Sequence, residues 1–131
     1  MKIAVCVDDN MGMLFNSRRQ SRDRELIKDF VETANNNNIY IKPFSKVLFD
    51  EYRVIIDNNM LNNAQENDFC FLENESILPY IDKVNELIIY RWNRNYPYDF
   101  CFEMPENFSL KESTEFKGSS HEKITKEIYI K

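Results

Sequence analysis

The feature that most constrains the fold is the segment 84–92, whose centre, residues 87–90, is continuously apolar. A strand without polar residues on either side has to be covered on both faces, as in the middle of a parallel sheet. A second short apolar run, Lys2–Val7, is rich in Ile and Val and is bounded by polar residues, which predicts another buried strand. Both runs indicate a sheet with other elements packed on its two faces.

Helical and strand patterns alternate along the first two thirds of the chain. From Ser21 onward, apolar residues recur at helical spacing, with Ser21 as the predicted N-cap and Asp23 in the first turn. Ile39–Ile41 is predicted to be a short strand, closed by Pro43. The remaining expected elements are a polar loop over 8–19, a short helix followed by a strand at 54–56, a loop over 58–67 with a helical turn near residues 60 and 61, a strand over 69–72 and a short helix over 75–81.

The C-terminal part has the pattern of a β-hairpin. Residues 115–117 and 121–130 flank a turn at 118–120, and Ile124, Ile128 and Ile130 share one parity. The predicted fold class is therefore α/β, with a mixed, mainly parallel central sheet, helices on its faces and a C-terminal antiparallel hairpin. The 131 residues contain no repeat and no linker, so we expect a single domain over 1–131.

Charge and cysteine content limit the partners and the compartment. The chain has 17 Lys and Arg against 22 Asp and Glu, a net charge of -5, which argues against general binding of duplex nucleic acid or of a membrane surface. Cys6, Cys70 and Cys101 lie in separate apolar runs, so we expect buried thiols in a reducing compartment. Because the sequence contains neither a signal-peptide core nor a membrane span, we predict a cytoplasmic protein.

The densest charged feature is the segment SRRQSRDR at 17–24, which carries Arg18, Arg19, Arg22 and Arg24. Guanidinium groups bind phosphate and carboxylate through paired hydrogen bonds, and the start of a helix also favours anions. The segment therefore predicts a local anion site on an acidic protein. The alternative is a solvated helix start whose arginines pair with nearby acidic residues.

Acidic residues and one histidine are the other candidates for chemistry. Asp8 and Asp9 follow the first predicted strand, where open α/β sheets bind ligands and where two carboxylates offer oxygen ligands to a hard cation. Paired aspartates are equally an ordinary way to leave a sheet, and we assign no metal. His121 is the single histidine, which excludes a metal site built from several histidines. It can act as a general acid or base if a carboxylate orients it, or it can be an exposed residue of the hairpin turn.

Several common motifs are absent. The sequence has no GxGxxG, GxxxxGK[ST], GxSxG or CxxC. It therefore lacks the motifs of dinucleotide-binding proteins, P-loop proteins, serine hydrolases and thioredoxins. Aromatic residues alternate between Tyr90 and Phe102 beside two arginines, which would suit base stacking. Period-two aromatics are more simply explained by packing in a sheet.

Three segments resemble the dihydrofolate reductases. IAVCVDDNMGMLFN followed by RRQSRDRELIKDF is similar to the family's opening strand, mobile substrate loop and first helix, with Gly12, Asn16 and Asp23 at the matching positions. ILPYIDKVNELIIYRWN is similar to a late helix and strand of the family, and TEFKGSSHEKITKEIYI to its terminal hairpin with a Ser-His pair. The resemblance implies a reduced dihydrofolate-reductase-like fold.

The chain departs from that family where ligands bind. Residues 18–21 replace a tryptophan and two prolines, Lys42 and Pro43 replace a Gly-Arg pair, and Glu73 and Asn74 replace a Gly-Gly pair. Glycine is needed where the backbone must approach a dinucleotide closely, and a carboxylate near a pyrophosphate is unfavourable. We therefore expect no nicotinamide cofactor, and no other cofactor is predicted.

The sequence thus predicts a small binding or interaction protein that holds an anionic or nucleotide-like ligand, or an acidic protein partner, at the loop after the first strand. The predicted ligand-binding residues are Asn16, Arg18, Arg19, Gln20 and Arg22. If the chain is an enzyme, the predicted catalytic residues are His121 and Asp23. Two alternatives stay open: a metal-independent ribonuclease or other phosphate-ester hydrolase that uses His121 and the arginines, and a divergent reductase.

Overall fold

Two apolar strands form the centre of the molecule. In the computed structural model, which describes residues 1–131, β1 (Lys2–Val7) and β7 (Glu86–Arg91) pair in parallel along their whole length. In both strands the odd-numbered apolar residues pack into one core and the even-numbered ones into another, on opposite faces of the sheet. The continuously apolar segment is covered on both sides, as its sequence predicted.

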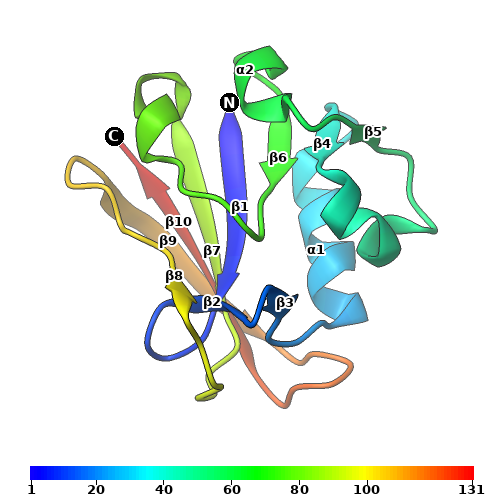
Figure 1. The fold of residues 1–131 in the computed structure, drawn as a ribbon, viewed down its shortest axis with the longest axis vertical. Helices are drawn as coiled ribbons and strands as arrows, with labels where there is room; N and C mark the ends of the chain where they lie inside the picture. The colour runs from blue at the N-terminus through cyan, green and yellow to red at the C-terminus, as the bar shows by residue number, and fades with distance from the viewer.

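The central sheet contains seven strands in the order β5-β4-β6-β1-β7-β10-β9 (Figure 1). The strands from β5 to β7 are parallel, whereas β10 is antiparallel to both β7 and β9. This confirms the predicted mixed sheet with a C-terminal hairpin. The five further strands are β4 (Ile39–Ile41), β5 (Ile55–Ile56), β6 (Phe69–Phe71), β9 (Ser109–Phe116) and β10 (Ile124–Ile130).

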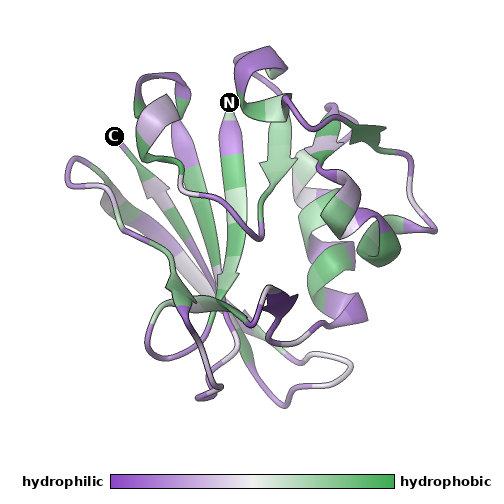
Figure 2. Cartoon of the chain, viewed as in Figure 1, coloured by the Kyte–Doolittle hydropathy of each residue, from purple (hydrophilic) through white to green (hydrophobic).

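Helices cover both faces of the sheet. On one face lie α1 (Arg24–Ala34) and the 3-10 helix η1 (Pro43–Phe49), and on the other α2 (Met60–Asn63) and the 3-10 helix η2 (Leu78–Lys83). The helical turn predicted within 58–67 is confirmed as α2, while the helix expected over 75–81 begins later, as η2. Apolar residues concentrate in the central strands β6, β1 and β7 (Figure 2). None of the helices has the length and apolarity needed to cross a lipid bilayer.

A second, small sheet was not predicted from the sequence. It consists of β3 (Arg18–Arg19), β2 (Gly12–Phe15) and β8 (Phe100–Cys101), in that order. The sequence predicts only a polar loop over 8–19. Asn16 and Ser17 have positive φ angles of 51° and 62°, and two such residues in succession form the tight turn that joins paired strands. The turn lacks glycine, which is why the hairpin gave no sequence signal.

Positive φ angles are confined to residues other than glycine. Such angles are unfavourable for residues with a Cβ atom, and asparagine tolerates them best. One of them, Asn35 with a φ of 46°, forms the C-cap of α1. The residues with positive φ are Met11, Asn16, Ser17, Asn35, Asn36 and Asn93.

The three cysteines are free thiols in different environments. Cys70 is buried, and burial raises the pKa of its thiol to about 12. Cys6 is half-buried, and desolvation raises the pKa of its thiol well above the ordinary value. Cys101 is exposed in β8, so the expectation of three buried thiols is wrong for this residue. Its neighbour Phe102 is the residue that packs into the core.

Phe30 of α1 tests how far the fold depends on the core beneath that helix. Its ring lies 6.1, 6.2 and 5.4 Å, centroid to centroid, from the rings of Phe49, Phe69 and Phe71. Phe30→Ala should lower the free energy of unfolding by about 3–5 kcal/mol, because it removes buried area and leaves a cavity. Urea denaturation measures this change. Phe15→Ala, at a side chain that is 41% exposed, should cost less than about 1 kcal/mol, and equal losses would contradict the packing argument.

Candidate functional site

Asp23 begins α1 and is its N-cap. Its extended backbone, with φ of -154° and ψ of 126°, precedes the first helical residue, Arg24. The Oδ1 atom accepts hydrogen bonds from the backbone N–H groups of Glu25 at 2.9 Å and Leu26 at 3.3 Å. These donors would otherwise lack partners at the start of a helix. The prediction that Ser21 caps the helix is therefore wrong, and Ser21 is free to make a different contact.

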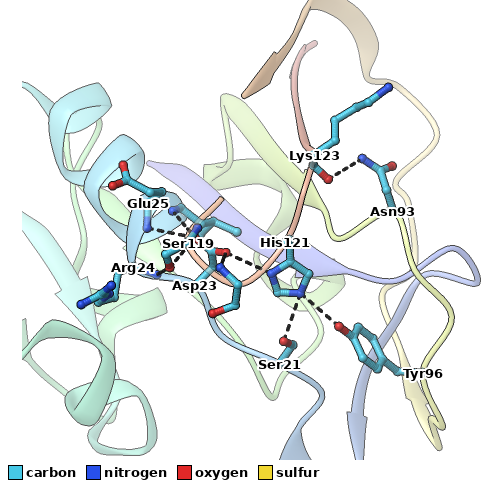
Figure 3. A network of polar contacts seen from close by, with 11 residues as sticks. Ser21, Asp23, Arg24, Glu25, Asn93, Tyr96, Ser119, His121 and Lys123 are labelled. Atoms are coloured by element: carbon cyan, nitrogen blue, oxygen red, sulfur yellow. Dashed lines mark hydrogen bonds and ion pairs between the residues drawn. The ribbon is translucent and has the colours of Figure 1, made fainter. Parts of the chain in front are cut away.

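The turn of the C-terminal hairpin packs directly against the Asp23 carboxylate (Figure 3). Oδ1 accepts from the N–H and the hydroxyl of Ser119 at 2.9 and 3.2 Å. Oδ2 accepts from the N–H of Ser120 at 2.7 Å and lies 3.0 Å from His121 Nδ1. Gly118 makes this approach possible, since a Cβ atom there would lie 2.3 Å from Oδ2. The carboxylate thus joins the helix start to the hairpin.

These hydrogen bonds keep Asp23 ionised. Burial by itself would raise the pKa of its carboxyl group, but the hydrogen bonds from His121, Ser119, Ser120 and Leu26 outweigh burial and lower the pKa to about 2. At neutral pH the carboxylate can only accept, so the proton between Asp23 and His121 belongs to His121 Nδ1. In the neutral imidazole the Nε2 atom is then an acceptor.

His121 lies beneath the hairpin and connects it to the arginine segment. Its side chain is 2% exposed and stacks on Trp92, with 4.5 Å between the ring centroids. Nε2 lies 3.2 Å from Ser21 Oγ and 3.0 Å from the Tyr96 hydroxyl. Ser21, His121 and Asp23 therefore form one continuous line of hydrogen bonds (Figure 3). The alternative of an exposed histidine in the hairpin turn is wrong.

Arg19 is paired within the protein. Its Nε and Nη2 atoms donate to the two oxygens of Glu73, each at 2.9 Å, and Nη2 also donates to the carbonyl of Phe44 at 2.8 Å. Ser45 donates to the same carboxylate at 2.7 Å. The hydrogen bond with Glu73 raises the pKa of Arg19. This group joins β3 to the segment after β6, and the Glu73 carboxylate offsets the charge of Arg19, which weakens its attraction for an external anion.

A small cavity lies between the Arg19–Glu73 pair and Ser21. It is lined by residues of β1, the arginine segment, α1 and the end of β6, and its volume is about 20 Å³. A cavity of this size holds one water molecule. Gln20 borders it, and its buried Oε1 atom has no hydrogen-bond partner in the chain.

A larger groove lies next to Asp23, and its volume is about 550 Å³. Its walls come from the start of α1, from η1 with the residues that follow it, and from the hairpin turn. Its polar lining residues are Arg22, Asp23, Arg24, Asp50, Glu51, Ser119 and Ser120, and its less polar ones are Ile27, Val47, Leu48 and Tyr52. Arg22 and Arg24 are exposed and form no ion pair. Arg18, which lies outside the groove, is also exposed and also forms no ion pair.

Asp8 holds the loop after β1 in place. One carboxylate oxygen accepts from the N–H groups of Asn10 and Gly12, each at 2.8 Å, and the other from the N–H of Tyr96 at 3.1 Å and from Gln20 Nε2 at 3.2 Å. Its oxygens are thus used by donors of the chain. No group of three or more His, Cys, Asp or Glu side chains is arranged to hold a metal ion.

The predicted site residues fall into separate groups. Asp23 and His121 are in contact, and Arg22 borders both cavities. Asn16 and Arg18 are exposed in and beside the turn between β2 and β3 and line neither cavity. The sequence does not identify Ser21, Tyr96, Ser119 or Ser120 as site residues. The only signal for them was the Ser-His pair in the resemblance, because their partners are distant in the chain.

Comparison with solved structures identifies the architecture. A dihydrofolate reductase from Enterococcus faecalis, complexed with NADP(H) and RAB-propyl, superposes on the chain with a TM-score of 0.68 at 11% sequence identity. The match covers 99% of this chain and 95% of the reductase. The chain has a dihydrofolate-reductase-like fold. No protein-family model and no curated protein matches it in sequence.

The residues at the positions expected to bind a dinucleotide in this fold do not fit one. Glu73, which stands where a Gly-Gly pair is expected, has a side chain only 10% exposed that is paired with Arg19. Lys42, in place of a glycine, pairs with Glu75. A pyrophosphate would meet the carboxylates of Glu73 and Glu75 here, and like charges repel. The dihydrofolate-reductase-like fold is therefore retained without its expected glycines.

Asp23 makes the stability of the protein depend on pH. A carboxyl group whose pKa falls from 3.8 to about 2 on folding stabilises the folded state above pH 3.8, and this contribution disappears as the pH falls through 2. Asp23→Asn should therefore lower the free energy of unfolding at pH 7 by about 2 kcal/mol, with a smaller difference from the wild type in acid. Urea denaturation between pH 2 and 7 measures this. Asp9→Asn, at an exposed residue, is the matched control, and a loss independent of pH would contradict the assignment.

Proposed function

We propose that this chain is a binding protein for a small anionic ligand, which it holds in the groove between α1, η1 and the hairpin turn. The observation that carries this proposal is the presence of two exposed guanidinium groups without ion pairs, those of Arg22 and Arg24, in a groove of about 550 Å³. Paired guanidinium groups recognise phosphate or carboxylate. A groove of this size matches ordinary small-molecule sites.

The other groove residues favour a nucleotide-like ligand. Asp50 and Glu51 lie in the same groove as the arginines and accept hydrogen bonds, as from the amino group of a base. Leu48 and Tyr52 offer apolar surface for a flat ring. A mononucleotide carries an anionic group, a ring and hydrogen-bond donors within one molecule of suitable size.

This assignment shifts the predicted site along the chain. Arg22 keeps its predicted role, and Arg24, Ser119 and Ser120 join it. Arg19 is held by Glu73, so we assign it to positioning of the loop rather than to ligand contact. Asn16 and Arg18 remain predictions for a larger ligand or a protein partner. The free thiols support a reducing, cytoplasmic location.

Isothermal titration calorimetry with AMP and with inorganic phosphate tests the proposal. The double variant Arg22→Gln/Arg24→Gln should bind AMP at least about tenfold more weakly, because each charge-assisted hydrogen bond contributes roughly 1.5–3 kcal/mol. Arg94→Gln/Lys111→Gln removes the same charge from exposed positions outside the groove and should bind as the wild type does. Absence of binding by the wild type, or equal losses in both double variants, would overturn the proposed site.

The reductase alternative has a direct test of its own. The cavity beside Asp23 and Arg19 has room for one water molecule, so neither a pteridine ring nor a nicotinamide ring fits there. NADPH and a folate analogue should leave the melting temperature unchanged. A ligand present at 100 times its Kd adds about 2.7 kcal/mol to the free energy of unfolding. An increase of several degrees in the melting temperature with either compound would therefore support the reductase hypothesis.

The ribonuclease alternative is limited by the burial of its proposed base. His121 is 2% exposed, and both of its ring nitrogens already have partners. The ring therefore reaches a substrate only through a hydroxyl group that it contacts. Any acid–base chemistry of His121 has to pass through Ser21 or Tyr96.

A further inference from the structure

The line of hydrogen bonds from Ser21 through His121 to Asp23 has the order of a nucleophile, a base and a carboxylate that orients the base (Figure 3). Ser21 Oγ lies 3.2 Å from Nε2, and Nδ1 lies 3.0 Å from Asp23 Oδ2. We propose that Ser21 is the nucleophile of an ester-hydrolysing site, with His121 as its general base. The order of groups matches that of serine hydrolases, although no GxSxG motif is present.

The hydrogen bonds fix the direction of proton transfer. The Asp23 carboxylate accepts from Nδ1, so the lone pair of Nε2 faces the two hydroxyl groups of Ser21 and Tyr96. When Ser21 gives its proton to Nε2, the ring becomes positively charged beside the Asp23 anion. A carboxylate in this position stabilises the charged ring and holds its orientation. Asp23 is thus a positioning residue.

Ser21 is the member of the line that solvent reaches. It is half-buried, whereas Asp23 and His121 are buried. Ser21 lines the small cavity, and that cavity shares Arg22, Asp23, Ile27 and Leu48 with the larger groove. A molecule bound in the groove therefore lies beside the segment that carries the hydroxyl group.

Donors for a developing oxyanion are present on the same segment. The backbone N–H groups of Ser21 and Arg22 have no hydrogen-bond acceptor within the chain. In serine hydrolases the N–H group of the residue after the nucleophile commonly stabilises the oxyanion. Arg22 adds a guanidinium group next to the nucleophile.

The reaction balances as an ordinary ester hydrolysis. Ser21 Oγ bonds to the ester carbonyl carbon and its proton moves to His121 Nε2; the bond from this carbon to the alcohol oxygen then breaks, and the proton passes to the leaving alcohol. Water then bonds to the acyl carbon on Ser21 and gives a proton to Nε2, and the bond from this carbon to Ser21 Oγ breaks, which releases the acid. The proton returns to Ser21 Oγ. One ester and one water become one acid and one alcohol.

The substrate class follows from the groove. An ester whose acyl part also carries a free carboxylate would place that carboxylate at Arg22 and Arg24. This preference rests on the proposed function, whereas the identity of the nucleophile does not. The two statements therefore need separate measurements.

A fluorophosphonate probe identifies the nucleophile. Attack by Ser21 Oγ forms an oxygen–phosphorus bond and releases fluoride, and intact-mass spectrometry with peptide mapping locates the adduct. Wild-type protein should gain one adduct, at Ser21, and Ser21→Ala should gain none. Ser113→Ala, at an exposed hydroxyl of β9, is the matched control and should label as the wild type does. Tyr96→Phe should label at least as fast as the wild type, since it removes the competing donor to Nε2.

Two chromogenic esters separate the two statements. Hydrolysis of 4-nitrophenyl acetate should fall at least about 100-fold in Ser21→Ala and stay unchanged in Arg94→Gln/Lys111→Gln, whose exposed side chains lie outside both cavities. Hydrolysis of the mono-4-nitrophenyl ester of succinic acid should be faster than that of the acetate, and in Arg22→Gln/Arg24→Gln kcat/KM for the succinate ester should fall about tenfold further than kcat/KM for the acetate. If both esters depend on Ser21 but neither on the arginines, the groove assignment fails and the nucleophile stands.

A thiol at the same position tests the pairing with His121 without removing the side chain. In Ser21→Cys the new thiol should react with iodoacetamide at least about tenfold faster than Cys101, the exposed thiol of the same molecule, because His121 accepts its proton. Melting temperatures within a few degrees of the wild type show that the variants are folded. The proposal is overturned if wild-type protein shows no adduct, if the adduct survives Ser21→Ala, or if the new thiol reacts no faster than Cys101.

Discussion

The structure of this end of the molecule depends on one carboxylate. Asp23 accepts hydrogen bonds from six donors, two in the first turn of α1 and four in the hairpin turn some 96–98 residues further along the chain. An isolated buried charge would be strongly unfavourable, but here every donor favours the ionised form. The position of the hairpin, the orientation of His121 and the wall of the groove all follow from this contact.

The regular part of the fold was predictable because burial leaves a strong signal. The apolar runs of β1 and β7 and the helical spacing of α1 come from residues that face a core on one or both sides. Strand β9 was predicted too short, since all but its last residue are exposed and the strand carries no apolar pattern. The sheet formed by β2, β3 and β8 was missed because asparagine and serine, rather than glycine, make its turn.

The site was predictable only as separate residues. Asp23 and His121 were both candidates, but no pattern in the sequence relates positions 98 residues apart. Because serine is common at helix caps, the sequence predicts Ser21 as the N-cap, whereas its hydroxyl contacts His121. The sequence predicts Arg19 as an anion ligand, yet Glu73, which is 54 residues away, already forms an ion pair with its guanidinium group. Local chemistry identifies which groups are reactive, and the fold decides which of them are already paired.

The use of glycine in this chain has a consequence for engineering. Gly12 and Gly118 both serve close approach, and neither takes a positive φ angle. The left-handed positions are instead occupied by residues whose Cβ atoms make that conformation unfavourable. Asn35 and Asn36, at the exposed end of α1, are two such positions whose side chains form no hydrogen bond. Glycine adopts the left-handed conformation without a Cβ clash, so Asn→Gly substitutions here would relieve backbone strain at positions that line neither cavity.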